Sequence, residues 1–99
     1  MNKKTLAIVI PCYNEAKRLP IENYKSFFKR VHDASIFFVN DGSNDQTENL
    51  IEGIREDFKD NIHLISLKKN KGKAEAVSTG FNHVLKTIIL KKLPFWMLI

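Results

Sequence analysis

The chain has 99 residues, enough for one small domain spanning 1–99, and its 43% hydrophobic and 27% charged residues are typical of a soluble globular protein. The net charge of +5 fits either a solvated lysine-rich surface or a chain that prefers phosphates and anionic membranes. The single cysteine, Cys12, excludes an intrachain disulfide and a zinc cluster, and no stretch approaches the ~18 apolar residues of a membrane span.

Apolar runs and helical periodicities alternate along the first half of the chain. Leu6–Ile10 is a continuous apolar run, typical of a strand buried on both faces. Pro20 then stands at the start of a predicted helix with apolar side chains at helical spacing: Ile21, Tyr24, Phe27, Phe28 and Val31. Ser35–Val39 predicts a second strand. A second helix follows, capped by Ser43 or Asn44, and its buried stripe is expected to be Leu50, Ile51, Ile54 and Phe58.

The second half continues the alternation. Ile62–Leu67 predicts a third strand, and a basic loop over 68–72 leads to a third helix over about 74–86. We expect this helix to bury its apolar side chains: Ala76, Val77, Phe81, Val84 and Leu85. Phe95–Ile99 follows Pro94 as a fourth strand would. Alternating strands and helices with crossovers of this length predict an α/β fold of right-handed βαβ units on a parallel sheet.

Polar side chains follow the first two predicted strands directly. Tyr13 and Glu15 come after the first strand, and Asp41 stands in the turn that ends the second. Ligands of open parallel sheets bind where the carboxyl ends of strands diverge, so these two ends suggest a site for a polar ligand such as a nucleotide. The local sequence leaves other interpretations open. Asp41 also suits an Asx-turn or a helix cap, and Tyr13 and Glu15 also suit an ordinary surface loop.

The basic segment Asn70–Lys73 precedes the third helix. Its backbone N–H groups and lysines could bind an anion, or the segment could be a solvated loop. It lacks the glycine spacing of a P-loop. The three histidines have no metal-ligand spacing, and no serine stands in a nucleophile elbow. Common metal sites and hydrolase triads therefore receive no support.

Three segments in this order resemble family 2 glycosyltransferases of the GT-A fold, particularly the dolichyl- or polyprenyl-phosphate sugar synthases: Ile8–Glu15, Val39–Thr47, and Asn70–Ala76 with Gly80. The resemblance implies a three-layer, Rossmann-like half-domain whose four-stranded, mainly parallel sheet has the order 3-2-1-4. It also implies a nucleotide-diphospho-sugar donor, such as a UDP- or GDP-sugar. The implied reaction transfers the sugar with inversion to a lipid phosphate or a saccharide.

On this resemblance six residues form the donor site. Pro11, Tyr13 and Glu15 would line the nucleoside pocket, Asp41 would bind the base, and Gly72 and Lys73 would lie close to the nucleotide. The family holds Mg²⁺ or Mn²⁺ on an Asp-x-Asp motif after the fourth strand, and this sequence contains no such motif. We therefore assign no metal ligands and no catalytic residues, and we expect a truncated nucleotide-binding half-domain without competent catalysis.

Two other classes of function stay open. One is a non-enzymatic nucleotide-binding or interaction module that self-associates through uncovered sheet surface. The other is a basic phosphate- or nucleic-acid-binding domain, which only the lysines of 68–73 support. We expect no nucleic-acid partner. The lone cysteine fits a cytoplasmic chain, which would meet the cytoplasmic face of a membrane only through a lipid acceptor.

Overall fold

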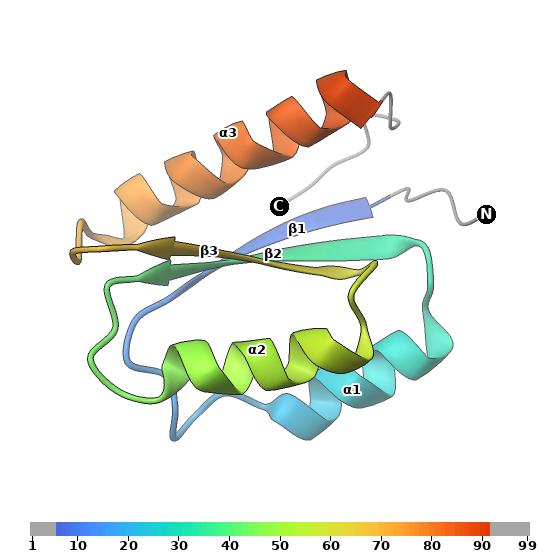
Figure 1. Cartoon of the computed structure of the whole chain (residues 1–99), viewed down its shortest axis with the longest axis horizontal. Helices are drawn as coiled ribbons and strands as arrows, with labels where there is room; N and C mark the ends of the chain where they lie inside the picture. The colour runs from blue at the N-terminus through green and yellow to red at the C-terminus, as the bar shows by residue number, and fades with distance from the viewer. Residues whose placement is uncertain (1–5, 92–99) are drawn as a thin grey trace.

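The computed structural model describes residues 6–91, which form a parallel three-stranded sheet between two layers of helices (Figure 1). The elements in chain order are β1 (Leu6–Cys12), α1 (Ile21–Arg30), β2 (Ala34–Asp41), α2 (Thr47–Asp57), β3 (Ile62–Leu67) and α3 (Lys73–Lys91). Helix α3 covers one face of the sheet, and α1 and α2 cover the other (Figure 1). The predicted α/β class and its alternation of strands and helices are confirmed.

Strand β2 lies between β1 and β3, and both pairings are parallel. Every residue of β2 is buried, as expected for a strand covered on both faces. The register places Cys12 opposite Asn40, so β1 and β2 end at the same level. The loops that follow them, 13–20 and 42–46, are therefore neighbours. The predicted fourth strand, Phe95–Ile99, lies outside the described residues, and the order 3-2-1-4 stays a prediction.

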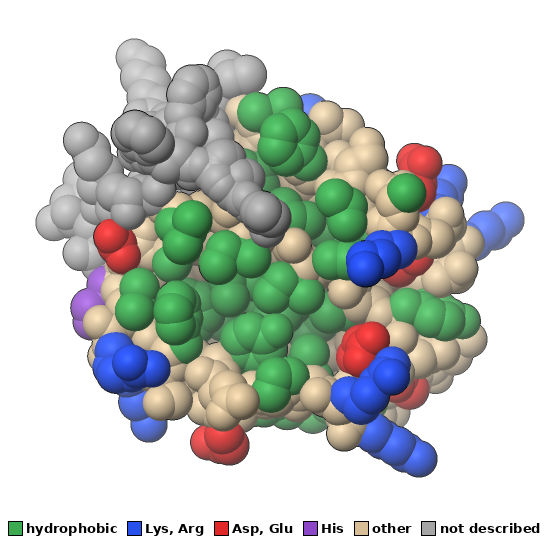
Figure 2. Space-filling model, turned by 180° about the vertical axis from the view of Figure 1, so that it is seen from behind, with side chains coloured by type: hydrophobic (Ala, Val, Ile, Leu, Met, Phe, Trp, Pro, Cys, Tyr) green, Lys and Arg blue, Asp and Glu red, His purple; other side chains and the backbone are tan. Residues whose placement is uncertain are grey.

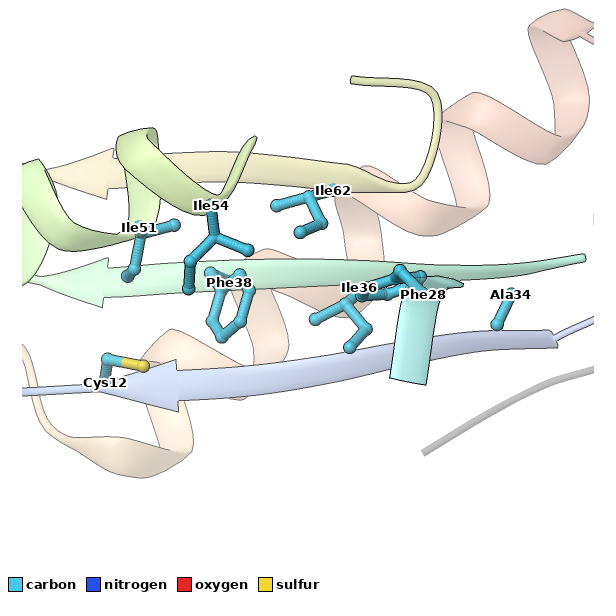
Figure 3. Close-up of a cluster of buried hydrophobic side chains, with 8 residues drawn as sticks. All are labelled: Cys12, Phe28, Ala34, Ile36, Phe38, Ile51, Ile54 and Ile62. Atoms are coloured by element: carbon cyan, nitrogen blue, oxygen red, sulfur yellow. The ribbon is translucent and has the colours of Figure 1, made fainter. Parts of the chain in front are cut away.

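A hydrophobic cluster fills the space between the sheet and the pair α1 and α2 (Figure 3). Its buried members come from five elements: Cys12, Phe28, Ala34, Ile36, Phe38, Ile51, Ile54 and Ile62. Tyr24 packs edge-on against Phe38, with ring centroids 5.3 Å apart. The apolar stripes predicted for the first two helices thus face this core, with Leu50 only partly buried on α2.

The predicted buried face of α3 is partly wrong. Ala76 and Val84 are buried, but the side chains of Val77, Phe81 and Leu85 are 38%, 43% and 37% exposed. The reason is Gly80, where an added Cβ would lie only 2.5 Å from a methyl carbon of Val9 on β1. The helix approaches the sheet at its smallest residue, which turns its larger apolar side chains outward.

One face of the molecule carries an apolar surface. Figure 2 shows hydrophobic side chains gathered in the centre of the face opposite to that of Figure 1. Besides the three exposed residues of α3, Leu6 and Tyr13 are exposed large hydrophobic residues. Within residues 6–91 no helix combines the length and hydropathy needed to cross a membrane.

The predicted caps of α2 are also wrong. The helix begins at Thr47 after Gln46, whose side chain makes no capping hydrogen bond. Ser43 and Asn44 lie before the helix and bond to the loop after β1 instead. Helix α3 begins at Lys73 and continues to Lys91, five residues beyond its predicted end at 86.

Candidate functional site

A cleft of about 320 Å³ opens at the carboxyl ends of β1 and β2. It is lined by Pro11, Cys12, Tyr13, Glu15, Asp41, Asn70, Gly72 and Lys73. All six residues predicted as a donor site therefore lie around one cavity, although they come from three separate segments. Sequence reasoning missed Cys12 and Asn70, both of which stand inside motifs that it did identify.

The Asp41 carboxylate holds the loop between β3 and α3. Its Oδ1 accepts a hydrogen bond from the N–H of Lys71 at 2.8 Å, and its Oδ2 accepts one from the N–H of Gly72 at 3.0 Å. The Asn70 side-chain amide donates to the same Oδ2 and to the Asp41 carbonyl, each at 3.1 Å. Asp41 is only 3% exposed. The structure shows neither the Asx-turn nor the helix cap considered from the sequence, but a carboxylate that joins two loops.

Gly42 allows the same two loops to approach each other. Its φ of +69° lies in the left-handed region, and an added Cβ would lie 2.4 Å from the backbone nitrogen of Asn70. The turn that follows Asp41 therefore requires glycine twice, once for its backbone conformation and once for space.

Asn14 and the loop after β2 bond to each other in both directions. The N–H of Asn14 donates to Ser43 Oγ at 3.0 Å, and the N–H of Asn44 donates to Asn14 Oδ1 at 2.8 Å. Asn14 has a φ of 51°, a left-handed conformation that asparagine tolerates better than most residues. Asn40 adds support from β2, since its Oδ1 accepts from the N–H of Ser43 at 3.2 Å.

The next two N–H groups of the loop after β1 are bound by Asp45 and Thr47. The N–H of Glu15 donates to Thr47 Oγ1 at 2.9 Å, and the N–H of Ala16 donates to Asp45 Oδ2 at 3.2 Å. Thr47 donates from both its N–H and its hydroxyl to Asp45 Oδ1. We call these two side chains, with the two N–H groups they bind, the Asp45–Thr47 clamp.

Tyr13 and Glu15 differ in how much of each remains available to a ligand. Tyr13 is 42% exposed at the cleft. The Glu15 carboxylate forms an ion pair with Arg18 Nε at 3.0 Å, and both side chains are solvent-accessible. Tyr13 thus offers an aromatic surface, and Glu15 offers an acceptor in an ion pair that water weakens.

Cys12 lies at the base of the cleft with only 2% of its surface exposed. Burial, followed by the nearby charge of Glu15, raises the pKa of its thiol to about 11. Burial is also the first cause that raises the pKa of Tyr24, and nearby charge acts in the same direction. Cys12 is therefore a neutral packing group at physiological pH rather than a nucleophile.

Two backbone N–H groups of the lysine loop are already used within the chain. The N–H groups of Lys71 and Gly72 already donate to Asp41. Lys68, Lys69 and Lys71 are exposed, and Lys73 alone of the loop's lysines lines the cleft. The N–H groups of Lys71 and Gly72 are therefore not available to an anion, whereas the Lys73 side chain lies where it could reach one.

The family model described as Glycosyl transferase family 2 matches residues 7–90. The chain belongs to this family. Its homologues include lipid-phosphate sugar transferases. It is 36% identical over 90 residues to the undecaprenyl-phosphate 4-deoxy-4-formamido-L-arabinose transferase of Yersinia pestis, covering 88% of this chain and 28% of that protein. It is 32% identical over 93 residues to the dolichyl-phosphate beta-glucosyltransferase ALG5A of Trichomonas vaginalis, covering 86% and 28%. The chain thus spans about a quarter of the length of the curated relatives it matches.

A solved structure shares the fold of this family 2 chain. It is the mannosyltransferase PcManGT of Pyrobaculum calidifontis, in complex with GDP-Man and Mn²⁺. The TM-score is 0.63 at 22% sequence identity, over 84% of this chain and 25% of that one. At this identity the likeness shows the GT-A type of fold alone.

The residues around the cleft do not fit a divalent cation. Residues 6–91 contain all His, Cys, Asp and Glu of the sequence and hold no cluster of three or more that could bind a metal ion. The two carboxylates at the cleft have other partners, since Asp41 accepts backbone N–H groups and Glu15 pairs with Arg18. Mg²⁺ usually keeps several waters and is held by one or two carboxylates together with substrate phosphates, so a site here would need a cleft carboxylate without another partner. The described part of the chain therefore supplies no metal centre.

Proposed function

We propose that the cleft binds the nucleoside end of a nucleotide-diphospho-sugar donor, a UDP- or GDP-sugar. The observation that supports this most directly is convergence. The six residues that the family resemblance implies for the donor site come from three separated motifs, and all six line one cavity at the carboxyl ends of parallel strands. Ligand sites of open α/β sheets lie at this edge.

Each group at the cleft has a role that its surroundings allow. Tyr13 would stack on the base with its exposed ring, and Glu15 would accept a hydrogen bond from a ribose hydroxyl. Asp41 would accept a base N–H, because a carboxylate has about four acceptor sites and the adjoining loop occupies three. Lys73 would face the phosphates.

We further propose that the parent reaction is inverting transfer of the sugar to a lipid phosphate or a saccharide. The names of the relatives support a lipid-phosphate acceptor, through which the protein would meet a membrane. Transfer also needs stabilisation of the leaving diphosphate and a base for the acceptor hydroxyl. In this proposal both carboxylates at the cleft contact the nucleoside, so neither is assigned to the diphosphate or to the acceptor. We therefore propose that these 99 residues bind donor without transferring sugar by themselves.

Isothermal titration of the chain with UDP and with GDP, in EDTA and in Mn²⁺, tests the donor site. We expect binding of one of these nucleotides that does not depend on Mn²⁺, because the donor set around the cleft does not fit a metal. Tyr13→Ala should weaken binding by about 1–3 kcal/mol, the usual contribution of one aromatic–base stack.

Phe81→Ala is the matched control. Phe81 is 43% exposed and Tyr13 is 42% exposed, but Phe81 lies on α3 outside the cleft lining. Its replacement should leave nucleotide affinity unchanged. Absence of binding by a chain that circular dichroism shows to be folded would refute the donor site.

A second candidate function is an interaction module that pairs with another copy of the same chain. The observation in its favour is the exposed apolar stripe of Val77, Phe81 and Leu85, which repeats every fourth residue along α3. Sedimentation of the wild type and of Phe81→Lys measures it. A dimer that the lysine disrupts would support this module, and a monomeric wild type would exclude it.

A further inference from the structure

The two side chains of the Asp45–Thr47 clamp bind the backbone of a loop that lines the cleft. The two bound N–H groups belong to Glu15, which lines the cleft, and to Ala16. Neither Asp45 nor Thr47 lines the cavity. The clamp therefore acts on the backbone that carries a proposed ligand contact, and it does so from a different loop.

We propose that Asp45 and Thr47 are positioning residues for nucleotide binding, which hold the backbone of Glu15 where its side chain and Tyr13 face the ligand. The inference rests on the proposed function, because it names residues that set the geometry of that same cleft. Neither side chain touches the ligand in this proposal.

The hydrogen bonds of the clamp form a directed chain. The hydroxyl of Thr47 has one proton, which it donates to Asp45, so its lone pairs are left to accept the N–H of Glu15. Asp45 is thus the acceptor that orients the hydroxyl, and its second oxygen accepts the N–H of Ala16. Hydrogen bonds to an ionised acceptor are stronger than neutral ones.

The clamp is anchored on a rigid element. Thr47 is the first residue of α2, and none of its surface is exposed. Helix α2 also buries Ile51 and Ile54 in the main core. The clamp therefore holds the loop after β1, which has few buried side chains of its own, in a fixed position relative to a packed helix.

The pKa of Asp45 is lowered although its side chain is exposed. The hydrogen bond from the Thr47 hydroxyl is the largest of the causes that lower its pKa, and the N–H groups of Thr47 and Ala16 act in the same direction. The hydrogen bonds of the clamp thus favour the ionised form of its acceptor.

A purely structural role is the competing explanation, because the bond from the Thr47 N–H to Asp45 also stabilises the first turn of α2. Two variants of one residue separate the explanations. Thr47→Val keeps the shape but removes the hydroxyl, and Thr47→Ser keeps the hydroxyl but removes a buried methyl. A structural role makes affinity follow stability in both, whereas a positioning role makes affinity follow the hydroxyl.

The experiment measures three quantities in the 99-residue chain and each variant: the urea midpoint, the amide exchange rate of Glu15 without ligand, and the Kd for UDP and GDP. For Thr47→Val we expect faster exchange at Glu15 and an affinity at least about 5-fold weaker, because the partly buried N–H of Glu15 loses its acceptor. For Thr47→Ser we expect a lower urea midpoint but a Kd within about 2-fold of the wild type, which is the rescue by the conservative variant.

Asp45→Asn should also speed the exchange of the Ala16 amide and weaken nucleotide binding, because an amide has only one acceptor oxygen where the clamp uses two. Asp60→Asn is the matched control. Asp60 is an exposed aspartate in the turn before β3, at the amino ends of the strands, whereas the cleft lies at their carboxyl ends. This variant should change neither quantity.

The outcomes distinguish this inference from the proposed function. If the wild type binds a nucleotide and folded Thr47→Val binds it equally well, the positioning role is refuted while the donor site stands. Equal weakening in Thr47→Val and Thr47→Ser also refutes it. If the folded wild type binds neither UDP nor GDP, the donor site itself is refuted, and the positioning role with it.

Discussion

Gly42→Ala tests how closely the loops around the cleft are packed. Gly42 follows Asp41, and its added Cβ would lie 2.4 Å from the backbone nitrogen of Asn70 and 2.5 Å from the carbonyl carbon of Lys69. Both contacts are with backbone, which cannot rotate away as a side chain can. The loop cannot retreat without cost either, because the Asp41 carboxylate binds two of its N–H groups.

The expected loss of stability has two parts. A non-glycine residue in the left-handed region costs roughly 1–2 kcal/mol, and the φ of Gly42 is +69°. Overpacking a tight contact costs roughly 1–3 kcal/mol. The sum of about 2–5 kcal/mol is a large part of the roughly 5–15 kcal/mol by which a domain of this size is stable.

Urea denaturation followed by circular dichroism measures this loss, with Gly72→Ala as the matched control. Gly72 lies in the same loop system with a φ of +97°, but nothing lies within 4 Å of its added Cβ. Its replacement should cost only the conformational part, about 1–2 kcal/mol. If Gly42→Ala destabilises the chain no more than Gly72→Ala, the steric part of the reasoning is wrong.

Three further predictions concern ionisable groups. Asp41→Asn should lower the free energy of unfolding, measured in urea, by roughly 1–3 kcal/mol. The asparagine has an amide nitrogen in place of one carboxylate oxygen, and this nitrogen cannot accept the N–H of Lys71 or Gly72. A loss no larger than that of Asp60→Asn would contradict this. The thiol of Cys12 ionises near pH 9.0 in the unfolded chain, and its pKa is raised to about 11 in the folded one. The free energy of unfolding should therefore fall as the pH rises between these two values, and more steeply in the wild type than in Cys12→Ala. Urea titrations at the two ends of this pH range measure the difference. The pKa of Asp45 is lowered, so its contribution is present above its ordinary value near 3.8 and is lost as the pH falls through the lowered one. Acid unfolding followed by circular dichroism should therefore depend less on pH in Asp45→Asn, and identical acid curves would contradict the reasoning.

Strand β2 could be predicted from the sequence because burial of all its residues leaves a direct record in composition. It extends the predicted Ser35–Val39 by one residue at its start and two at its end, and β3 has the predicted bounds Ile62–Leu67. The added Asn40 and Asp41 are polar, so hydropathy could not include them. They are nevertheless buried, because each has hydrogen-bond partners in neighbouring segments.

The outward face of α3 could not be predicted from hydropathy. Periodicity identifies apolar positions, and Val77, Phe81 and Leu85 satisfy it. Which apolar face meets the sheet depends on how closely the backbones approach, and Gly80 allows the closest approach. A glycine inside a helix is the one signal in the sequence that could have indicated this contact.

The loop contacts were beyond local sequence reasoning for a different reason. Ser43 and Asn44 have the residue types of helix caps, yet each bonds to Asn14, about thirty positions earlier in the chain. Their partners become neighbours only because β1 and β2 pair in a register that ends both strands at one level. The residue types predicted polar loop ends correctly, and the strand register then determined which polar groups meet.

Asp41 shows why the structural and ligand-binding interpretations of a residue need not compete. The loop between β3 and α3 occupies three acceptor sites of its carboxylate, and a carboxylate has about four. Those bonds fix the orientation of the group, so on the proposed function a base N–H would meet an acceptor that needs no rearrangement. Binding energy would then not be spent on ordering the site. The same reasoning extends to the Asp45–Thr47 clamp, which on our proposal fixes the backbone of the loop after β1. Loss of either set of bonds should therefore weaken nucleotide binding through increased loop motion, even where every side chain that faces the ligand is retained.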